Sequence, residues 1–537
     1  MTRSEQMNCR HGHHSKRKRK GGFFVLSTFH GLETVRRGMT AQQQALYVTG
    51  HNIANANTPG YSRQRVNFEQ TPPYPFASQN RPVMPGQMGT GVEGGTVQRM
   101  REEFLDVQYR GENMKYGYWN TRAEALYKME EIMNEPSDEG LAKTLDRFWQ
   151  ALQDLAVNPS NSGARSVVRQ RGMAVAETFH YLSSSLKSIR DDLKNELDVT
   201  VKAANSLARQ LNDINKQISE VEVHGYLPND LYDERNRLLD ELSQYVNIKV
   251  TPVPSGGSAL KIAEGRFTVE LVDRTGSTVI GTLVDGRLGQ VNELQLSYQD
   301  NMTKTGPVVG FSLGNTTFST FERLKENGKI GALLYSYGYS EDGGTTTKGL
   351  YPEMLGDLNA MAKAFADQFN EVHSSGFSVT EIKNNVTIPG SKPFFTYNSN
   401  DPAGTFDVAQ IIKDSLDNIA ASATGQIGDG SNAQALAEVK NGMMNIAGNT
   451  TTIQNFYESV IGQMAVNAQE AKRLSQNSEV LRQSVDERRM AVSSVSLDEE
   501  MMNMMKFQHA YNASARMITM IDQMLDKIIN NMGIVGR

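Results

Sequence analysis

Cysteine is almost absent from this chain, since the one cysteine among 537 residues is Cys9. The 512 residues after Val25 therefore contain no disulfide, no cysteine-based zinc site and no thiol nucleophile. No run approaches the roughly 18 to 20 consecutive apolar residues of a membrane-spanning helix, which excludes a transmembrane protein. With 38% hydrophobic residues and 16 prolines, the composition excludes collagen-like and wholly disordered chains, and the length suits about three or four domains.

Basic residues are scarce outside the N-terminus. The first 25 residues hold seven Lys or Arg and one acidic residue. Without them, the 55 basic residues fall to 48 and the 60 acidic residues to 59, a net charge of −11. Non-specific binding to nucleic acid needs Lys and Arg at the phosphates, so the body of the chain is a poor candidate for it.

The basic leader, residues 1–26, has a His-rich tract that is open to three readings: a metal tract, a nucleic-acid arm or a targeting signal. Its apolar stretch, Phe23 to Leu26, is too short for a cleaved signal peptide. Lys20-Gly21-Gly22 can be encoded by a purine run typical of a bacterial ribosome-binding site. We therefore expect residues 1–26 to be non-native or disordered, which N-terminal sequencing of the cellular protein would test.

Apolar residues recur every seven positions at both ends of the chain, the pattern of helices that pair along a stripe. The second stripe follows a capping box that begins at Ser496. It is too long to be buried by one small domain, so we expect the terminal helices to pair with each other and with neighbouring copies. The candidate assembly positions are Leu32, Met39, Leu46, Ile53, Leu497, Met504, Tyr511, Ile518 and Leu525.

A linker follows the first helix. Asn tolerates the left-handed conformation, Pro restricts the residue before it and Gly permits positive φ, so the helix is expected to stop there. The candidate hinge residues are Asn55, Asn57, Thr58, Pro59, Gly60 and Tyr61.

The middle of the chain alternates between helical and β patterns. A stripe from Leu186 to Val221 predicts a rod-like helix, and Asp230 to Val246 predicts a partner that closes a hairpin. Thr, Val and Gly become frequent from Asn247 and predict strands. We predict a multidomain α+β fold with a terminal helical coiled-coil domain (27–61 and 496–537), a mainly helical core domain (62–246, 330–376 and 428–495), an inserted β domain (247–329) and a second β-rich insertion (377–427).

Motifs for catalysis are weak, and we predict no enzyme, no cofactor and no metal site. Gly89-x-Gly91-x-x-Gly94 resembles a dinucleotide fingerprint by letters, but a strand-like run follows it, so we interpret these as strand and turn glycines. His51 and His373 are isolated and are interpreted as surface or satisfied helix positions.

The terminal segments resemble the bacterial flagellar rod and hook axial family. The run from Asn52 to Tyr61 is typical of the whole family, whereas the opening from Ser27 and the triplet Tyr61-Ser62-Arg63 resemble its hook-filament junction members. Leu497 to Met501 is similar to the family's C-terminus. The resemblance implies a structural adaptor at the hook-filament junction that is needed for filament assembly. It also implies an extracellular place in the flagellum, reached through the flagellar type III export apparatus without a cleaved Sec signal.

The resemblance further implies partners: other copies in a helical ring, the hook protein, the second hook-filament junction protein and a flagellar export chaperone, but no nucleic acid or membrane. Two alternatives stay open. One is another axial protein of the hook or rod, and the other is a secreted coiled-coil adhesin whose β insertions bind ligands. The long internal helix and the Tyr61-Ser62-Arg63 triplet favour the junction protein over the first.

Overall fold

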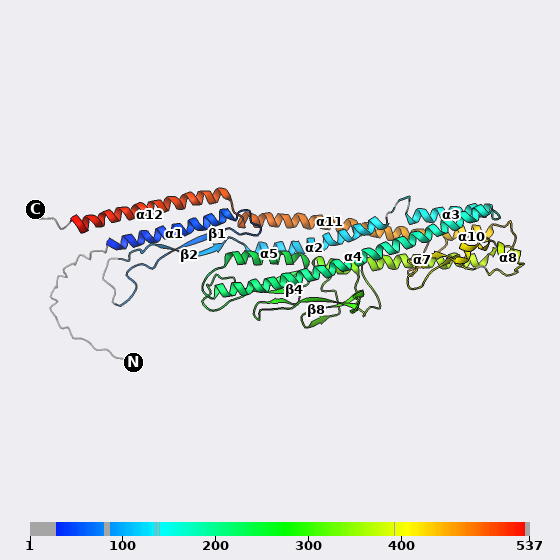
Figure 1. The fold of residues 1–537 in the computed structure, drawn as a ribbon, viewed down its shortest axis with the longest axis horizontal. Helices are drawn as coiled ribbons and strands as arrows, with labels where there is room; N and C mark the ends of the chain where they lie inside the picture. The colour runs from blue at the N-terminus through cyan, green and yellow to red at the C-terminus, as the bar shows by residue number, and fades with distance from the viewer. Residues whose placement is uncertain are drawn as a thin grey trace, which may run out of the picture. The chain divides into compact units, whose positions relative to one another are not determined.

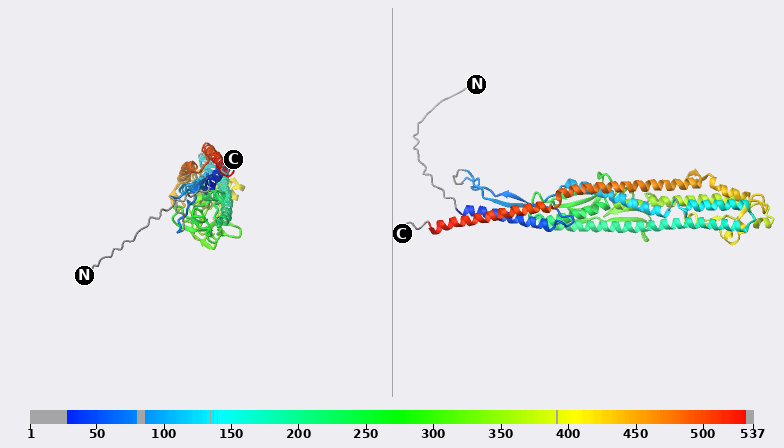
Figure 2. Two further views of the ribbon diagram at one scale, coloured as in Figure 1. Left: turned by 90° about the vertical axis from the view of Figure 1, so that its left-hand side faces the viewer. Right: turned by 90° about the horizontal axis from the view of Figure 1, so that it is seen from above.

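The chain divides into two compact units in the computed structural model, which describes residues 28–79, 86–133, 135, 137–138, 140–390 and 392–531 (Figures 1 and 2). The terminal unit comprises the described parts of 1–57, 63–99 and 495–537, and the helical unit comprises 58–62 and the described parts of 100–494. The expected leader, 1–26, lies outside the described residues, as do 532–537 of the expected terminal domain.

Two helices from opposite ends of the chain lie side by side in the terminal unit, α1 (Thr28–Ala54) and α12 (Leu497–Asn531) (Figure 1). They run antiparallel, because a Cβ on Gly31 would lie 3.6 Å from Ile521 while one on Gly38 would lie 3.9 Å from Ser514. Seven residues forward on α1 thus correspond to seven residues backward on α12.

A two-stranded antiparallel sheet of β1 (Gln64–Gln70) and β2 (Val92–Arg99) packs against α1 in the same unit. Val66 is buried there, and a Cβ on Gly91 would lie 3.2 Å from the carbonyl oxygen of Thr34. The sequence pattern assigns residues 62–99 to the helical core, but this packing puts 63–99 with the terminal helices. Gly91 has φ +113°, a conformation that favours glycine, and Gly94 lies within β2. Both positions agree with the interpretation of this motif as strand and turn glycines.

The helical unit is built on α4 (Ser162–Glu222), a helix of 61 residues. Its apolar stripe is buried along most of its length, and the side chain of Asn161 caps its start by accepting a hydrogen bond from the Gly163 N–H at 2.8 Å. The expected partner helix is present as α5. The other long helices are α2 (Glu103–Met133), α3 (Leu141–Val157), α5 (Asn229–Tyr245), α6 (Gly328–Tyr337), α7 (Leu350–Ser375), α10 (Ser431–Glu438) and α11 (Ile453–Ser493).

The expected β insertion after Asn247 forms two antiparallel sheets against α4. A four-stranded sheet has the order β3 (Ile248–Val253), β4 (Arg266–Val272), β5 (Val279–Asp285) and β6 (Gln290–Val291). A three-stranded sheet has the order β7 (Leu294–Asp300), β8 (Thr305–Leu313) and β9 (Thr316–Phe318). A further hairpin joins β14 (Met444–Ile446) to β15 (Asn449–Thr451).

Residues 377–427 differ from the β-rich insertion that we expected. Their strands are two or three residues long: β10 (Phe377–Ser378), β11 (Phe395–Thr396), β12 (Asp407–Val408) and β13 (Ala420–Ser422). Short helical turns lie between them: α8 (Val379–Lys383), α9 (Gln410–Asp414) and η1 (Leu416–Asn418), and η2 (Val439–Asn441) follows α10. The cause is burial, since Phe394, Phe395 and Phe406 pack with aromatic rings of the long helices rather than in a sheet of their own.

Candidate assembly interface and linker

The sequence-derived stripes lie largely where α1 and α12 meet. Ile518 and Leu525 are three or four residues from Ser514 and Ile521, which approach α1, and so share their face of the helix. Leu497 differs, because it is 49% exposed. The half-buried positions are Leu32, Met39, Leu46, Ile53, Met504, Tyr511, Ile518 and Leu525.

A second apolar face runs along α12 and stays uncovered in the described chain. Met520 comes two residues after Ile518, which places it about 200° around the helix, on the side away from α1. It is 47% exposed, and Met524, one turn further, is 55% exposed. The exposed apolar residues of α12 are Leu497, Met501, Met502, Met505, Met517, Met520, Met524, Ile528 and Ile529. Ile528 and Ile529 continue the stripe beyond Ile521 and Leu525, whereas five methionines lie on the side away from α1. We call these five the methionine face: Met502, Met505, Met517, Met520 and Met524.

The heptad pattern does not mark the methionine face as a separate surface. The sequence does carry a signal for it, because Met517, Met520 and Met524 follow at helical spacings of three and four. Methionine side chains are unbranched and adapt to irregular partners, so such a face can pack against surfaces of different shape.

A buried polar junction joins three segments of the terminal unit. The side-chain amide of Asn52 donates to the carbonyl of Gln64 at 2.8 Å and accepts from the Gln64 N–H at 2.9 Å. It also donates to Glu500, which is 2% exposed, at 3.2 Å. Arg63 donates to Glu500 at 2.8 Å and to Glu499 at 2.6 Å. The acidic pair at the start of α12 therefore holds α12 to the start of β1.

The linker turns directly after α1. The Asn55 N–H donates to the carbonyl of His51 at 3.1 Å, and Asn55 and Asn57 belong to the terminal unit. Thr58, Pro59, Gly60 and Tyr61 belong to the helical unit. The Tyr61 N–H closes a turn on the carbonyl of Thr58 at 3.2 Å, and Gly60 has φ +83°, a conformation that favours glycine.

The end of this linker is fixed to α5. The backbone N–H of Ser62 donates to a carboxylate oxygen of Asp233 at 3.0 Å, and Arg101 donates to the Ser62 hydroxyl at 3.1 Å. A Cβ on Gly60 would lie 3.5 Å from the Cβ of Arg237. The sequence offered no signal for these contacts, because charges on a helix such as α5 normally indicate a solvated face.

Metal and membrane chemistry find no support in the part of the chain that the structure describes. No cluster of three or more His, Cys, Asp or Glu side chains there could hold a metal ion. No described helix is both long enough and apolar enough to cross a bilayer.

Comparison with known families places the two ends of the chain with proteins of the flagellar axis. Residues 32–61 match the family described as flagella basal body rod protein, and residues 488–532 match the one described as flagellar basal body rod FlgEFG protein C-terminal. Residues 126–386 match the flagellar hook-associated protein FlgK helical domain. The class is therefore that of flagellar structural components.

Individual relatives narrow this class. The chain is 47% identical to flagellar hook-associated protein 1 of Bacillus subtilis over 518 residues, which cover 96% of this chain and 100% of the relative. It is 27% identical to the Salmonella typhimurium protein of the same name, over 70% of this chain and 62% of the relative. The chain belongs to the flagellar hook-associated protein 1 (FlgK) family, whose members are structural proteins and not enzymes.

A solved structure supports the fold. The flagellar hook junction protein FlgK from Burkholderia pseudomallei aligns with a TM-score of 0.56 at 13% identity and covers 73% of this chain and 100% of its own. At that identity, the likeness shows a shared fold.

Proposed function

We propose that this protein is the adaptor that joins the hook to the filament and is needed for filament assembly. The single observation that carries the proposal is the pairing of α1 with α12, which leaves the methionine face open on the outer side of α12. Apolar surface of this extent on a soluble monomer marks a place for a partner. Neighbouring copies in a helical ring supply that partner, together with the hook protein and the second junction protein.

The half-buried stripe and the methionine face have different roles in this proposal. The stripe, which includes Met504 and Ile518, holds α12 to α1 within one copy, and it contacts neighbouring copies where it stays half exposed. The methionine face forms contacts between copies, and before assembly it is the surface that an export chaperone covers. The linker from Asn55 to Tyr61 sets the angle between the terminal helices and the rest of the chain.

Export as an unfolded chain through the flagellar type III apparatus completes the proposal. The absence of cysteine after Val25 suits such a route, because no disulfide has to be broken before export or formed after it. After export the two terminal helices pair within the subunit, and burial of the methionine face at the hook tip is then the step that joins the subunit to the structure.

A deletion strain tests this function. We expect hooks without filaments, and monomeric filament protein released into the medium. A strain that lacks the hook as well would indicate a hook or rod subunit instead, and a strain with normal filaments but impaired adhesion would indicate the adhesin. Complementation with the unmodified chain is the control.

A further inference from the structure

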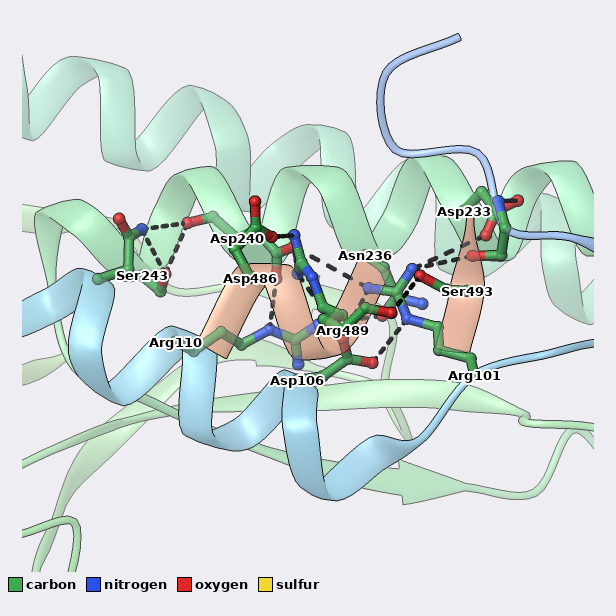
Figure 3. Close-up of polar contacts among 12 residues, drawn as sticks. Arg101, Asp106, Arg110, Asp233, Asn236, Asp240, Ser243, Asp486, Arg489 and Ser493 are labelled. Carbon is green, nitrogen blue, oxygen red and sulfur yellow. Dashed lines mark hydrogen bonds and ion pairs between the residues drawn. The ribbon is translucent and has the colours of Figure 1, made fainter. Parts of the chain in front are cut away.

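Charged side chains are concentrated in the helical unit around the N-terminal end of α2 (Figure 3). Three arginines, Arg101, Arg110 and Arg489, meet aspartates from α2, α5 and α11 there. Side-chain exposure is low, at 12% for Arg101, 9% for Arg110 and 16% for Arg489. We call this group the arginine–aspartate cluster; its aspartates are Asp106, Asp233, Asp240 and Asp486.

Asp240 on α5 is the shared member of the cluster. One carboxylate oxygen accepts from Arg110 Nε at 2.8 Å, and the other accepts from Arg489. A guanidinium nitrogen of Arg101 lies 4.0 Å from the same carboxylate. Arg110 also donates to the side chain of Asn236, one turn before Asp240, at 3.1 Å. α5 therefore holds all three arginines at once.

One branch of the cluster leads to the first linker. Arg101 pairs with Asp106 through two hydrogen bonds, at 2.6 and 2.8 Å, and its remaining nitrogen donates to the Ser62 hydroxyl. Asp233 accepts the Ser62 N–H and lies 3.9 Å from Arg101. Ser62 is buried, directly follows the linker, and is the last residue of segment 58–62 of the helical unit.

The other branch leads to the end of α11, which is the second place where the chain leaves this unit. Arg489 stacks over the ring of Tyr109 at 4.0 Å and pairs with Asp486 at 2.9 Å on its own helix. The hydroxyl of Ser493 donates to the carbonyl of Arg489 at 2.8 Å, and the Ser494 N–H donates to the carbonyl of Met490 at 2.9 Å. The last turn of α11 is thus tied through Arg489 to Asp240 and Asp106, the carboxylates that Arg101 of the first branch also approaches.

We propose that the arginine–aspartate cluster is a common clamp for the two linkers of the helical unit, so that Ser62 and Ser494 become ordered or loosen together. The physical basis is that water poorly solvates a charged side chain of this buried cluster when one of its partners is removed. Loss of Arg489 leaves Asp240 and Asp106 with an unbalanced charge, which shifts Arg101. Arg101 bonds the Ser62 hydroxyl and lies 3.9 Å from Asp233, the acceptor of the Ser62 N–H, so its shift loosens both contacts of Ser62. The clamp is a property of the single chain and does not depend on the proposed function.

Hydrogen exchange of the backbone amides in Arg489→Gln tests the clamp. The amides of Ser62 and Ser494 are both expected to exchange at least about tenfold faster than in the unmodified chain, because a buried partner is lost. The amide of Phe365, in the core of α7, should keep its rate. The matched control is Arg488→Gln, the exposed arginine that precedes Arg489 on α11.

Faster exchange at Ser494 alone, with Ser62 unchanged, would overturn the clamp. Equal acceleration at Ser62, Ser494 and Phe365 would also overturn it, since that result indicates general destabilisation. If Arg489→Gln does not fold, Arg489→Lys is measured in the same way, because lysine keeps the charge but loses the planar fork that reaches two carboxylates. The reverse variant, Arg101→Gln, should accelerate exchange at Ser494 as well as at Ser62.

Discussion

At the scale of single residues, the most informative polar group is His373 on α7. Its ring is fully buried, its Nδ1 lies 2.9 Å from the carbonyl of Lys392, and its Nε2 lies 3.0 Å from the N–H of Ala420. These partners require a neutral ring that donates from Nδ1 and accepts at Nε2. The histidine therefore joins α7 to the loop at Lys392 and to the first residue of β13, which confirms the interpretation of a satisfied helix position.

The same contacts predict a pH dependence of stability. Burial lowers the pKa of His373 to about 4 from its ordinary 6.5; the carbonyl of Lys392 and the charge of Glu381 oppose this, and the charge of Arg165 adds slightly to it. Between those pH values the unfolded chain holds a proton that the folded chain does not. The free energy of unfolding is therefore expected to fall by about 3 kcal/mol as pH drops from 6.5 to 4, and not to depend on this group above 6.5.

Urea unfolding at pH 7.5, 6 and 4.5 measures this effect. His373→Gln should be less stable at pH 7.5 and should lose part of the slope with pH, because glutamine does not titrate. His180, which is exposed on α4, provides the matched control His180→Gln. Parallel pH profiles for the unmodified chain and His373→Gln would contradict the assignment.

At the scale of elements, buried asparagines on helices complete the hydrogen bonding of strands. Asn215 on α4 donates to the carbonyl of Phe267 at 2.8 Å and accepts its N–H at 3.0 Å. Asn205, also on α4, does the same for Leu294, at 2.8 Å for both bonds. Each amide supplies the donor and the acceptor that a neighbouring strand would supply, so α4 is bonded to both sheets.

Replacing such an asparagine by an apolar residue of similar size leaves two backbone groups without partners. Asn215→Leu is expected to lower the free energy of unfolding by about 2 kcal/mol or more. Hydrogen exchange at the Phe267 amide should accelerate by at least the factor that corresponds to this loss of free energy. Asn195→Leu, at an exposed position of the same helix, should change stability little. An unchanged Phe267 amide in Asn215→Leu would refute this role.

How far the sequence predicts these elements depends on what holds each one. Long helices such as α4 and α12 are stabilised by burial of an apolar stripe. These stripes appear as periodic apolar residues in the sequence, from Leu186 to Val221 and from Leu497 onward. The short strands of residues 377–427 are held by phenylalanines that bury against distant helices, which leaves no local period to read. Asn205 and Asn215 cannot be distinguished from solvent-exposed asparagines by sequence alone, because their partners are strands far along the chain.

At the scale of the whole molecule, the two apolar faces of α12 predict different defects. Ile518→Leu should be tolerated, whereas Ile518→Asp places a charge between α12 and α1 and should separate these helices in the monomer. Trypsin digestion would then cut within residues 28–57 while α4 stays protected. If Ile518→Asp resists digestion in the terminal helices as the unmodified chain does, the stripe does not hold the pair.

The methionine face predicts loss of assembly without loss of folding. Met520→Asp should leave the monomer as stable as before, because this side chain faces away from α1, but should prevent filament formation in the complemented deletion strain. Gln508→Asp, which adds the same charge at an exposed polar position about 120° around the helix from Met520, is the matched control and should support filaments. Normal filaments with Met520→Asp would show that this face is not an interface.

The junction of Asn52 with Glu500 brings together two residues that are 448 positions apart in the chain. α12 is synthesised after α1 and its hairpin, and the helical unit lies between them in the chain. The terminal unit therefore cannot close before α12 is made, and its closure carries the entropic cost of a long loop. A chain that stops before α12 leaves α1 unpaired and Asn52 without Glu500. A finished terminal unit therefore requires that the ribosome has passed through the whole helical unit.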